Sequence, residues 1–251
     1  MKVELITWTP DPEILAATAA RVCYSDQSAT DISAALAASD IDRILDHVLA
    51  SGHHSVIEHI TFTFAIDDVS RVLTHQLVRH RVGIAFSQQS QRYVRLDPPA
   101  FLVPPAIAAS PDLCQQYQDL MAESHRVYAT LIAGGIPKED ARFALPEAVM
   151  TRIIMTANFR QLIHMYAINA CFRSQWEFRE LMRRIKSEVR RVCPRLSREL
   201  KIKCFSTGFC DEVKMCAQLE GRMPRKEDVF AGYQAYTHQF YEGLARSVDE
   251  A

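Results

Sequence analysis

Arginine, hydroxyl and amide side chains are concentrated between residues 71 and 96. Five arginines lie in this stretch, and no aspartate or glutamate occurs within it. Its centre carries Arg79-His80-Arg81, followed by the polar run SQQSQRY at 87–93. Guanidinium groups bind phosphate through paired hydrogen bonds, and hydroxyl and amide groups can complete the shell around such an anion. This arginine segment (71–96) therefore predicts a binding site for a phosphate-bearing ligand.

A solvent-exposed helix end is the alternative interpretation of Arg79 and Arg81, because positive charge at a helix C-terminus is common and mildly stabilising. The composition of the whole chain gives no general reason for such a concentration of positive charge. Its 251 residues carry a formal net charge of −1, with 48% hydrophobic and 24% charged residues. This is an ordinary globular composition, which argues against nucleic acid or a membrane as the partner. The arginine segment is a local feature.

Histidine and cysteine side chains do not follow a standard metal-binding spacing. His53, His54 and His59 are spaced by one and five residues, which is not a zinc pattern. Four of the seven cysteines lie near the C-terminal end, without a CxxC pair, at Cys193, Cys204, Cys210 and Cys216. A structural zinc there is the alternative, but the spacing favours free thiols and no metal. An odd cysteine count and the absence of an export signal predict a reducing, cytoplasmic location.

Hydrophobic periodicity predicts a mainly helical chain. The helices are expected at 12–24, 40–51, 70–80, 113–131, 137–143, 146–170 and 174–192. Asp40 is expected to cap the second of these helices, and Gly52 to end it. Gly134-Gly135 should end the long helix that precedes them.

Two short runs rich in β-branched and aromatic residues predict strands, at 3–8 and 59–66. The proline-rich segment 96–111 cannot form a regular element. The expected fold class is therefore α+β, mainly helical with a small mixed or antiparallel sheet. A composition change near Pro194 predicts a catalytic domain at 1–192 and a C-terminal extension at 193–251 that packs on it.

Several motifs in a fixed order resemble the flavin-dependent thymidylate synthase family. The family signature is Arg-His-Arg, seven residues and then serine, and it is usually continued by Arg-Tyr. The segments that carry the resemblance are GHHSVIEHITFTF (52–64), RHR (79–81), SQQSQRY (87–93), ARFALP (141–146), TANFRQLIHM (156–165) and SQWEF (174–178). Together they extend the resemblance over about residues 1–192.

The resemblance implies a fold and a reaction. The family makes dTMP from dUMP: methylenetetrahydrofolate supplies the carbon, and FAD, reduced by NADPH, supplies the hydride. Members are homotetramers whose active sites are assembled from several subunits. For this chain the resemblance implies a nucleotide substrate and self-association, with no nucleic-acid or membrane partner.

The resemblance also implies residue roles by position. Arg79, His80 and Arg81 would contact FAD, and Arg79 would also lie near the nucleotide. The other flavin-binding residues implied are Ser55, Gln88, Asn158, Arg160 and His164. The nucleotide-binding residues implied are Gln76, Ser90, Gln91, Arg92 and Arg142, together with Asn169 at the base. His53 matches a family histidine near the entry for flavin and folate.

Two departures from the family pattern affect these expectations. Eight residues, not seven, separate Arg81 from Ser90, and Gly83 is a suitable place to absorb the extra one. Asn169 replaces a family arginine that binds the uracil carbonyl and favours ionisation at N3. Because an amide can face a donor or an acceptor, dUMP, UMP and a cytidylate all remain possible substrates. Arg173, expected one helical turn later, could supply the missing charge.

Two other classes of function remain open at this stage. The segment 183–203 is strongly basic and could bind nucleic acid. It lacks the interleaved aromatic residues used for stacking on single strands, and its arginines alternate with an apolar stripe, so a solvated helix face is favoured. Asn169 also leaves open a scaffold that retains the fold without the chemistry.

Overall fold

A four-stranded sheet forms the centre of the fold in the computed structural model, which describes residues 1–231. The strands lie in the order β1-β2-β4-β3, and every neighbouring pair is antiparallel. Their bounds are β1 (Lys2–Trp8), β2 (Thr61–Ser70), β3 (Ile84–Gln88) and β4 (Met150–Asn158). The two central strands come from distant parts of the chain, so the sheet joins the histidine-rich segment to the later family motifs.

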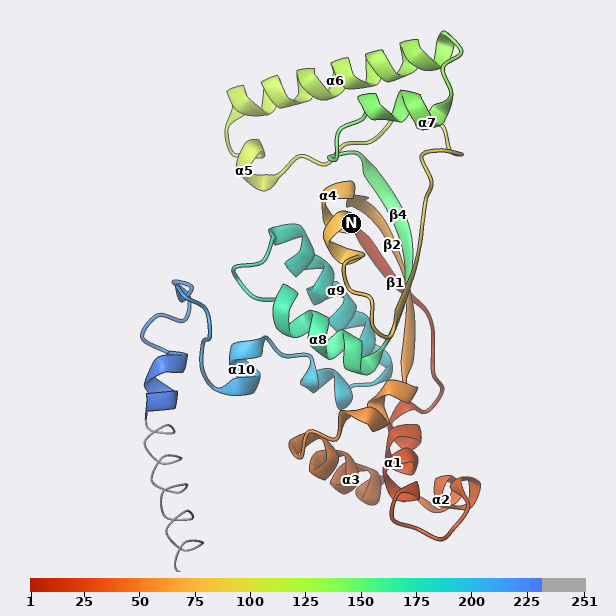
Figure 1. Ribbon diagram of the computed structural model, residues 1–251, viewed down its shortest axis with the longest axis vertical. Coiled ribbons are helices and arrows are strands. Elements are labelled where there is room, and N and C mark those ends of the chain that lie inside the picture. Colours follow the sequence, from red (N-terminus) through yellow and green to blue (C-terminus); the bar gives the residue numbers. More distant parts are fainter. Residues whose placement is uncertain (232–251) are drawn as a thin grey trace, which may run out of the picture.

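Helices cover one face of the sheet and extend beyond both of its ends (Figure 1). α8 and α9 lie beside the sheet, α5 to α7 lie beyond one end, and α1 to α3 lie beyond the other. The α-helices are α1 (Pro12–Val22), α2 (Ala29–Ala35), α3 (Ala38–Ala50), α4 (Arg71–Leu77), α5 (Pro105–Ala108), α6 (Pro111–Ala133), α7 (Lys138–Ala141), α8 (Phe159–Asn169), α9 (Trp176–Val192) and α10 (Lys203–Thr207). The 3-10 helices are η1 (His54–His59), η2 (Arg142–Ala144) and η3 (Leu196–Glu199).

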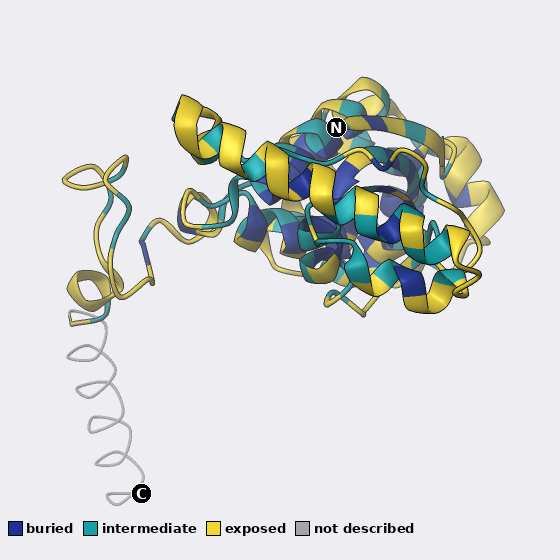
Figure 2. Cartoon of the chain, turned by 90° about the horizontal axis from the view of Figure 1, so that it is seen from above, coloured by how far each residue is buried: buried dark blue, intermediate teal, exposed yellow. Residues whose placement is uncertain are grey.

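The hydrophobic core lies between the sheet and helices α8 and α9. Alternate residues of β2 and β4 point into it, and α9 contributes a stripe of residues three or four apart. The residues concerned are Phe62, Phe64, Ile66, Ile153, Met155, Leu181, Met182, Ile185 and Val189, all at most 2% exposed. Viewed along the long axis, buried residues concentrate in the body of the molecule (Figure 2). This packing supports the short segments that carry the family motifs.

The predicted helix at 146–170 was wrong over its first half. Residues 150–158 form β4, and only 159–169 form a helix. The segment MTRIIMTAN alternates buried and exposed positions along the strand. Its threonines and isoleucines favour a strand, and pairing with β2 and β3 on both sides satisfies its main chain. Asn158 then accepts a hydrogen bond from the Gln161 N–H at 2.8 Å and caps α8.

Most of the other predicted helices and strands are confirmed, and so is the predicted α+β fold class. Gly52 follows α3 with a φ of 73°, and Gly134 caps α6. Asp40 was wrong as a cap, because α3 begins two residues earlier and Ala37 occupies the cap position without a side-chain hydrogen bond. The proline-rich connection contains one short helix, α5.

The described part of the C-terminal region consists of a segment that joins the core and a segment that is largely exposed. Cys193, Leu196 and Leu200 belong to the hydrophobic core. Residues 203–231 lie to one side of the body and are largely exposed (Figures 1 and 2). The domain boundary at 192 stays a prediction.

Candidate active site

Glu177 fixes the beginning of α4, the short helix that leads into the Arg79-His80-Arg81 motif. Its carboxylate accepts hydrogen bonds from the Ser70 N–H at 2.8 Å and from the Ser70 hydroxyl at 2.5 Å. The same hydroxyl accepts a hydrogen bond from the Leu73 N–H at 3.0 Å and so caps α4. Glu177 and Ser70 are both about 1% exposed. α9 thus holds α4 in place through a buried carboxylate, a role that the sequence interpretation missed.

His80 lies in a partly buried group with Asn169 and His164. The Asn169 amide nitrogen is 3.0 Å from His80 Nε2 and also donates to the Met165 carbonyl at 3.0 Å. The Met165 carbonyl requires a donor, so the Asn169 atom that faces it is the amide nitrogen. This nitrogen can only donate, so His80 Nε2 accepts its hydrogen bond and the ring proton lies on Nδ1. Burial, and after it the charge of His164, lower the pKa of His80. Both effects favour the neutral form of the His80 imidazole.

His164 and Phe178 complete the surroundings of His80. The His80 and His164 rings meet edge to face with centroids 6.0 Å apart, and the Phe178 ring lies 6.1 Å away in a similar arrangement. The structure therefore brings together three of the predicted residues, His80, His164 and Asn169.

Arg79 and Arg81 are exposed, and within residues 1–231 neither side chain makes a hydrogen bond or an ion pair with the protein. Other members of the arginine segment are paired. Arg92 contacts the Glu139 carboxylate at 2.9 Å, and Arg95 contacts Asp97 at 2.5 Å. The arginine segment has no acid in its own sequence, but Glu139 and Asp97 pair with Arg92 and Arg95. Within residues 1–231, no acid pairs with Arg79 or Arg81, the two arginines that flank His80.

Arg92 and Arg142 converge on one residue, Glu139, at the start of α7. Arg142 Nε donates to the Glu139 carbonyl at 2.9 Å, whereas Arg92 Nε donates to its carboxylate. The Ser90 hydroxyl accepts from the Arg92 N–H at 3.2 Å. Three predicted nucleotide-binding residues therefore lie together. Sequence reasoning missed Glu139, which lies 47 residues from Arg92 along the chain.

Gln88 and Gln76 lie near the junction of α4 with the sheet. The Gln88 amide donates to the hydroxyls of Thr74 at 3.1 Å and Thr151 at 3.4 Å. Gln76 donates to the Val72 carbonyl of its own helix at 3.4 Å. Gln91 is half-buried in the turn after β3. In this chain the Gln88 amide nitrogen ties β3 to α4 and β4.

Gly83 lies in a turn before β3, and the strand itself contains no bulge. β3 pairs with β4 in unbroken register from Ile84 to Gln88. Gly83 has a φ of 62°, and its carbonyl accepts from the Asn158 N–H at 2.8 Å. A Cβ at this position would lie 2.3 Å from the Asn158 side-chain nitrogen. Glycine is therefore required both by the backbone conformation and by the close approach of Asn158.

Gly83→Ala should destabilise the protein more than Gly135→Ala. Both glycines have positive φ, but a Cβ at Gly135 would meet nothing within 4 Å. The left-handed backbone costs about 1–2 kcal/mol in each variant, and only Gly83→Ala adds the clash with Asn158. Urea unfolding measures the difference. Equal losses in the two variants would show that the Asn158 contact has no energetic role.

A separate cavity of about 560 Å³ contains the predicted residues His53 and Ser55. Side chains of α1, α3 and η1 line it, including Arg43 of α3, together with Tyr24, which follows α1. Nearby, Arg160 at the start of α8 forms an ion pair with Glu58 of η1. The cavity is large enough for part of a cofactor. His53, Ser55 and Arg43 supply an imidazole, a hydroxyl and a guanidinium group to its lining.

The predicted site residues lie toward opposite ends of the folded molecule. α7, next to Arg142, lies near one end of the longest axis, and α3, beside the cavity with His53, lies near the other (Figure 1). The group around His80 lies between them, at α4 and α8. One chain does not bring all of these residues into a single pocket.

Arg173 lies away from His80 and Asn169. The helical spacing assumed between Asn169 and Arg173 was wrong, because α8 ends at Asn169. The Arg173 side chain faces the C-terminal segment, where it pairs with Glu212 at 3.5 Å and donates to the Lys214 carbonyl. Its catalytic role stays a prediction.

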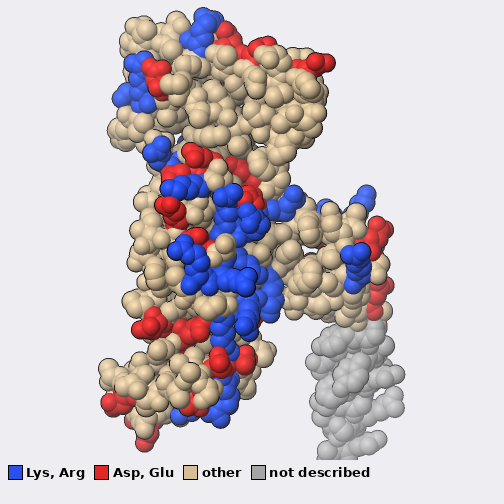
Figure 3. Space-filling model, turned by 180° about the vertical axis from the view of Figure 1, so that it is seen from behind, with Lys and Arg blue, Asp and Glu red and all other residues tan. Residues whose placement is uncertain are grey.

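Lysine and arginine form a band on the face opposite to the view of Figure 1 (Figure 3). Several arginines of α9 pair with glutamates of the same helix. Glu180 contacts Arg183 at 2.7 Å and Arg184 at 2.6 Å, and Glu188 contacts Arg191 at 2.9 Å. The Arg183 hydrogen bond is the main reason that the pKa of Glu180 falls to about 2. Such internal pairing is typical of a solvated helix face.

None of the helices in residues 1–231 is both long and apolar enough to cross a membrane. In the same residues, no three histidine, cysteine, aspartate or glutamate side chains are grouped closely enough to hold a metal ion.

Comparisons with known proteins agree with this fold. The family model described as "Thymidylate synthase complementing protein" matches residues 4–195. A flavin-dependent thymidylate synthase of Geobacter sulfurreducens is 42% identical over 214 residues, covering 84% of this chain and 91% of the relative. One from Pyrococcus furiosus is 37% identical over 220 residues, covering 84% and 90%.

A solved structure shows the same fold at lower sequence identity. The UMP/dUMP methylase PolB from Streptomyces cacaoi, bound with 5-Br dUMP, superimposes with a TM-score of 0.71. It is 22% identical, and the match covers 79% of this chain and 93% of that one. The fold and the match across residues 4–195 define a methyltransferase of the thymidylate synthase complementing type. The chain belongs to the flavin-dependent thymidylate synthase family.

Proposed function

We propose that the chain reductively methylates C5 of a uridine monophosphate, dUMP or UMP. The observation that carries this proposal is the pair of cations, Arg79 and Arg81, which have no protein partner within residues 1–231 and lie on either side of His80. Two such guanidinium groups beside a partly buried imidazole suit a ligand with a pyrophosphate and a polar ring. The names of the relatives, which are flavin-dependent thymidylate synthases, support FAD as that ligand.

The residues present fit a flavin and a nucleotide. Arg79 and Arg81 would hold the cofactor phosphates, and His80 and His164 would lie along the flavin. When bound, reduced FAD supplies the hydride, methylenetetrahydrofolate supplies the carbon, and NADPH reduces the flavin again. The contributions of this chain are charge neutralisation, orientation of the reactants and exclusion of water. Arg92 and Arg142 would bind the phosphate of the nucleotide, with Ser90 and Gln91 beside it.

A complete site requires more than one copy of the chain. The groups around Glu139 and around His53 lie toward opposite ends of the molecule (Figure 1). A homotetramer with shared active sites would bring the two groups from different copies together. Light scattering of the purified protein, with and without FAD, tests this assembly. A monomer in both conditions would contradict it.

Turnover with dUMP, UMP and dCMP side by side tests the proposed reaction. The full chain is supplied with methylenetetrahydrofolate, NADPH and FAD. We expect a yellow protein with flavin absorption, nucleotide-dependent NADPH oxidation and a product methylated at C5. A protein that retains FAD and oxidises NADPH without methylating any of the three nucleotides would overturn the methyl transfer. A colourless protein that does not take up FAD would overturn the cofactor.

Asn169→Arg should increase the preference for dUMP over dCMP. Arginine only donates hydrogen bonds, so at C4 it favours the carbonyl of uracil over the amino group of cytosine, whereas an amide can face either base. Hydrogen bonds to a charged group contribute about 1 kcal/mol more than neutral ones, so the ratio of kcat/KM should change about fivefold.

Asn169→Ala is the control for this change, because it also removes the contact with His80. It should lower turnover without increasing the preference for uracil. An unchanged ratio in Asn169→Arg would remove this position from base selection.

A further inference from the structure

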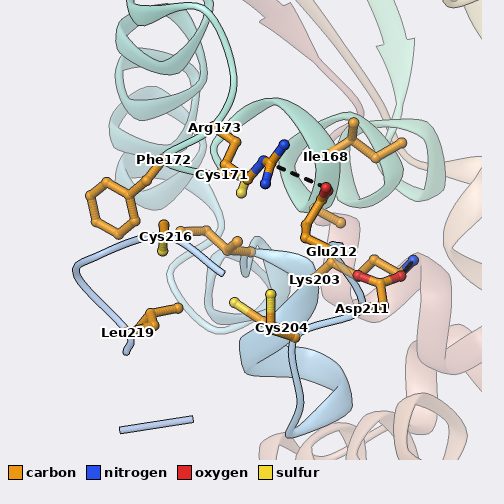
Figure 4. A pocket seen from close by; sticks show the side chains of 13 residues that line it. Ile168, Cys171, Phe172, Arg173, Lys203, Cys204, Asp211, Glu212, Cys216 and Leu219 are labelled. Carbon is orange, nitrogen blue, oxygen red and sulfur yellow. Dashed lines mark hydrogen bonds and ion pairs between the residues drawn. The ribbon is translucent and has the colours of Figure 1, made fainter. Parts of the chain in front are cut away.

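A cavity of about 220 Å³ lies between the end of α8 and the C-terminal segment (Figure 4). Four of the seven cysteines line it: Cys171, Cys204, Cys210 and Cys216. They come from three parts of the chain, namely the turn after α8, helix α10 and the segment that follows it. All four are free thiols, and the cysteines at 23, 114 and 193 do not line the cavity. No part of the proposed methylation uses these side chains.

All four cysteine side chains line this one cavity, but their sulfur atoms are not at coordinating distances. The candidate site is empty, and the described residues contain no group of three ligands close enough for a metal. A tetrathiolate site requires Zn–S distances of about 2.3 Å, so the four side chains have to come closer together when the metal binds.

Two cations at the cavity suit a site of high negative charge. Arg173 and Lys203 both line it, each paired with an acid of the C-terminal segment, Glu212 and Asp211 respectively (Figure 4). Four thiolates around one Zn²⁺ have a net charge of −2, and their four protons go to solvent. Arg173 and Lys203 can offset this charge once their ion pairs with Glu212 and Asp211 open. The remaining lining includes the apolar side chains of Ile168, Phe172 and Leu219.

We propose that Cys171, Cys204, Cys210 and Cys216 form a structural zinc site. Thiolates are soft ligands that favour zinc, and a cavity with four of them has the donor set of a closed structural site. The spacing between Cys204, Cys210 and Cys216 alone does not indicate zinc, because no CxxC is present. The fourth ligand, Cys171, comes from a distant part of the chain, which is why the sequence pattern did not reveal the site.

Zinc bound here joins the C-terminal segment to the end of α8. Cys171 lies two residues after Asn169, whose side chain contacts His80. The metal therefore steadies the helix end that positions Asn169. It also gives residues 203–219, which have few buried apolar side chains, a fixed attachment to the body.

Metal analysis of the full chain, purified from zinc-supplemented medium under reducing conditions, tests the site. We expect one zinc per chain. Removal of zinc with a chelator and titration with Co²⁺ should produce the absorption bands of a tetrahedral cobalt thiolate. In the zinc-loaded protein, the four cavity cysteines should resist alkylation until the chelator is added. Wild-type protein without stoichiometric zinc and without cobalt thiolate bands would overturn the proposal, as would a disulfide between Cys204 and Cys210 in freshly isolated protein.

Single substitutions locate the ligands. Cys204→Ser and Cys216→Ser should each lower the zinc content at least tenfold, whereas Cys23→Ser and Cys114→Ser should leave it unchanged. Circular dichroism shows whether each variant folds. Cys216 is only half-buried, so its substitution remains informative if Cys204→Ser does not fold. Equal zinc loss in the control variants would contradict the assignment, because those cysteines lie outside the cavity.

Discussion

Glu177→Ala is expected to lower the free energy of unfolding by about 3 kcal/mol. The substitution leaves two buried donors, the N–H and the hydroxyl of Ser70, without their acceptor, and each such loss costs about 1–3 kcal/mol. Ser70 also caps α4, so the position of Arg79 and His80 should become less well defined. Urea unfolding measures the stability, and flavin absorption measures cofactor retention. We expect both to decrease.

Two variants on α9 separate this effect from a general loss of charge. Glu180→Ala removes a carboxylate whose ion pairs are near the surface, and such pairs contribute about 0.3–0.5 kcal/mol each. Glu177→Gln retains an acceptor oxygen and should recover part of the loss. If Glu177→Ala were no more destabilising than Glu180→Ala, the contact with Ser70 would have no role in holding α4.

Arg92→Ala is expected to weaken nucleotide binding by about 10- to 150-fold. A hydrogen bond to a charged group such as phosphate contributes about 1.5–3 kcal/mol, which corresponds to this range. FAD should remain bound, because Arg92 lies with Ser90 and Arg142 at Glu139 and not with the group around His80. Calorimetric titration with dUMP measures the affinity, and flavin absorption reports the cofactor. Unchanged affinity would remove Arg92 from the nucleotide site.

Arg95→Ala is the matched control for Arg92→Ala. Arg95 lies three residues away and pairs with Asp97, but it has no predicted role in the site. Its removal should change the affinity little. Glu139→Gln provides the opposite test, because the Glu139 carboxylate competes with phosphate for Arg92. This variant should bind the nucleotide severalfold more tightly.

The helices were easier to predict from the sequence than the central strand. α3, α6 and α9 have apolar residues at regular helical spacing, and a glycine follows both α3 and α6. β4 was assigned to a helix because MTRIIMTAN adjoins FRQLIHMYAIN without a glycine or proline between them. What makes it a strand is pairing with β2 and β3, and β2 lies about 90 residues earlier in the chain. Local periodicity does not contain that information.

The motif residues of the candidate site were accessible from sequence, but their protein partners were not. His80, His164 and Asn169 were each named, and the fold brings them together. The roles of Glu139 and Glu177 were missed, although Glu139 lies close to the motif ARFALP and Glu177 lies within the motif SQWEF. Their contacts with Arg92 and Ser70 span 47 and 107 residues of the chain. Contacts over such distances depend on the packing of whole elements.

The turn at Gly83 has a consequence for recognising related sequences. Eight residues lie between Arg81 and Ser90, and the turn at Gly83 precedes β3, whose pairing with β4 continues without a shift. A search pattern that demands seven positions between the Arg-His-Arg triplet and the serine would reject this chain, although the later part of the signature is intact. Patterns for this family should allow a variable gap there, provided that glycine is present to form the tighter bend.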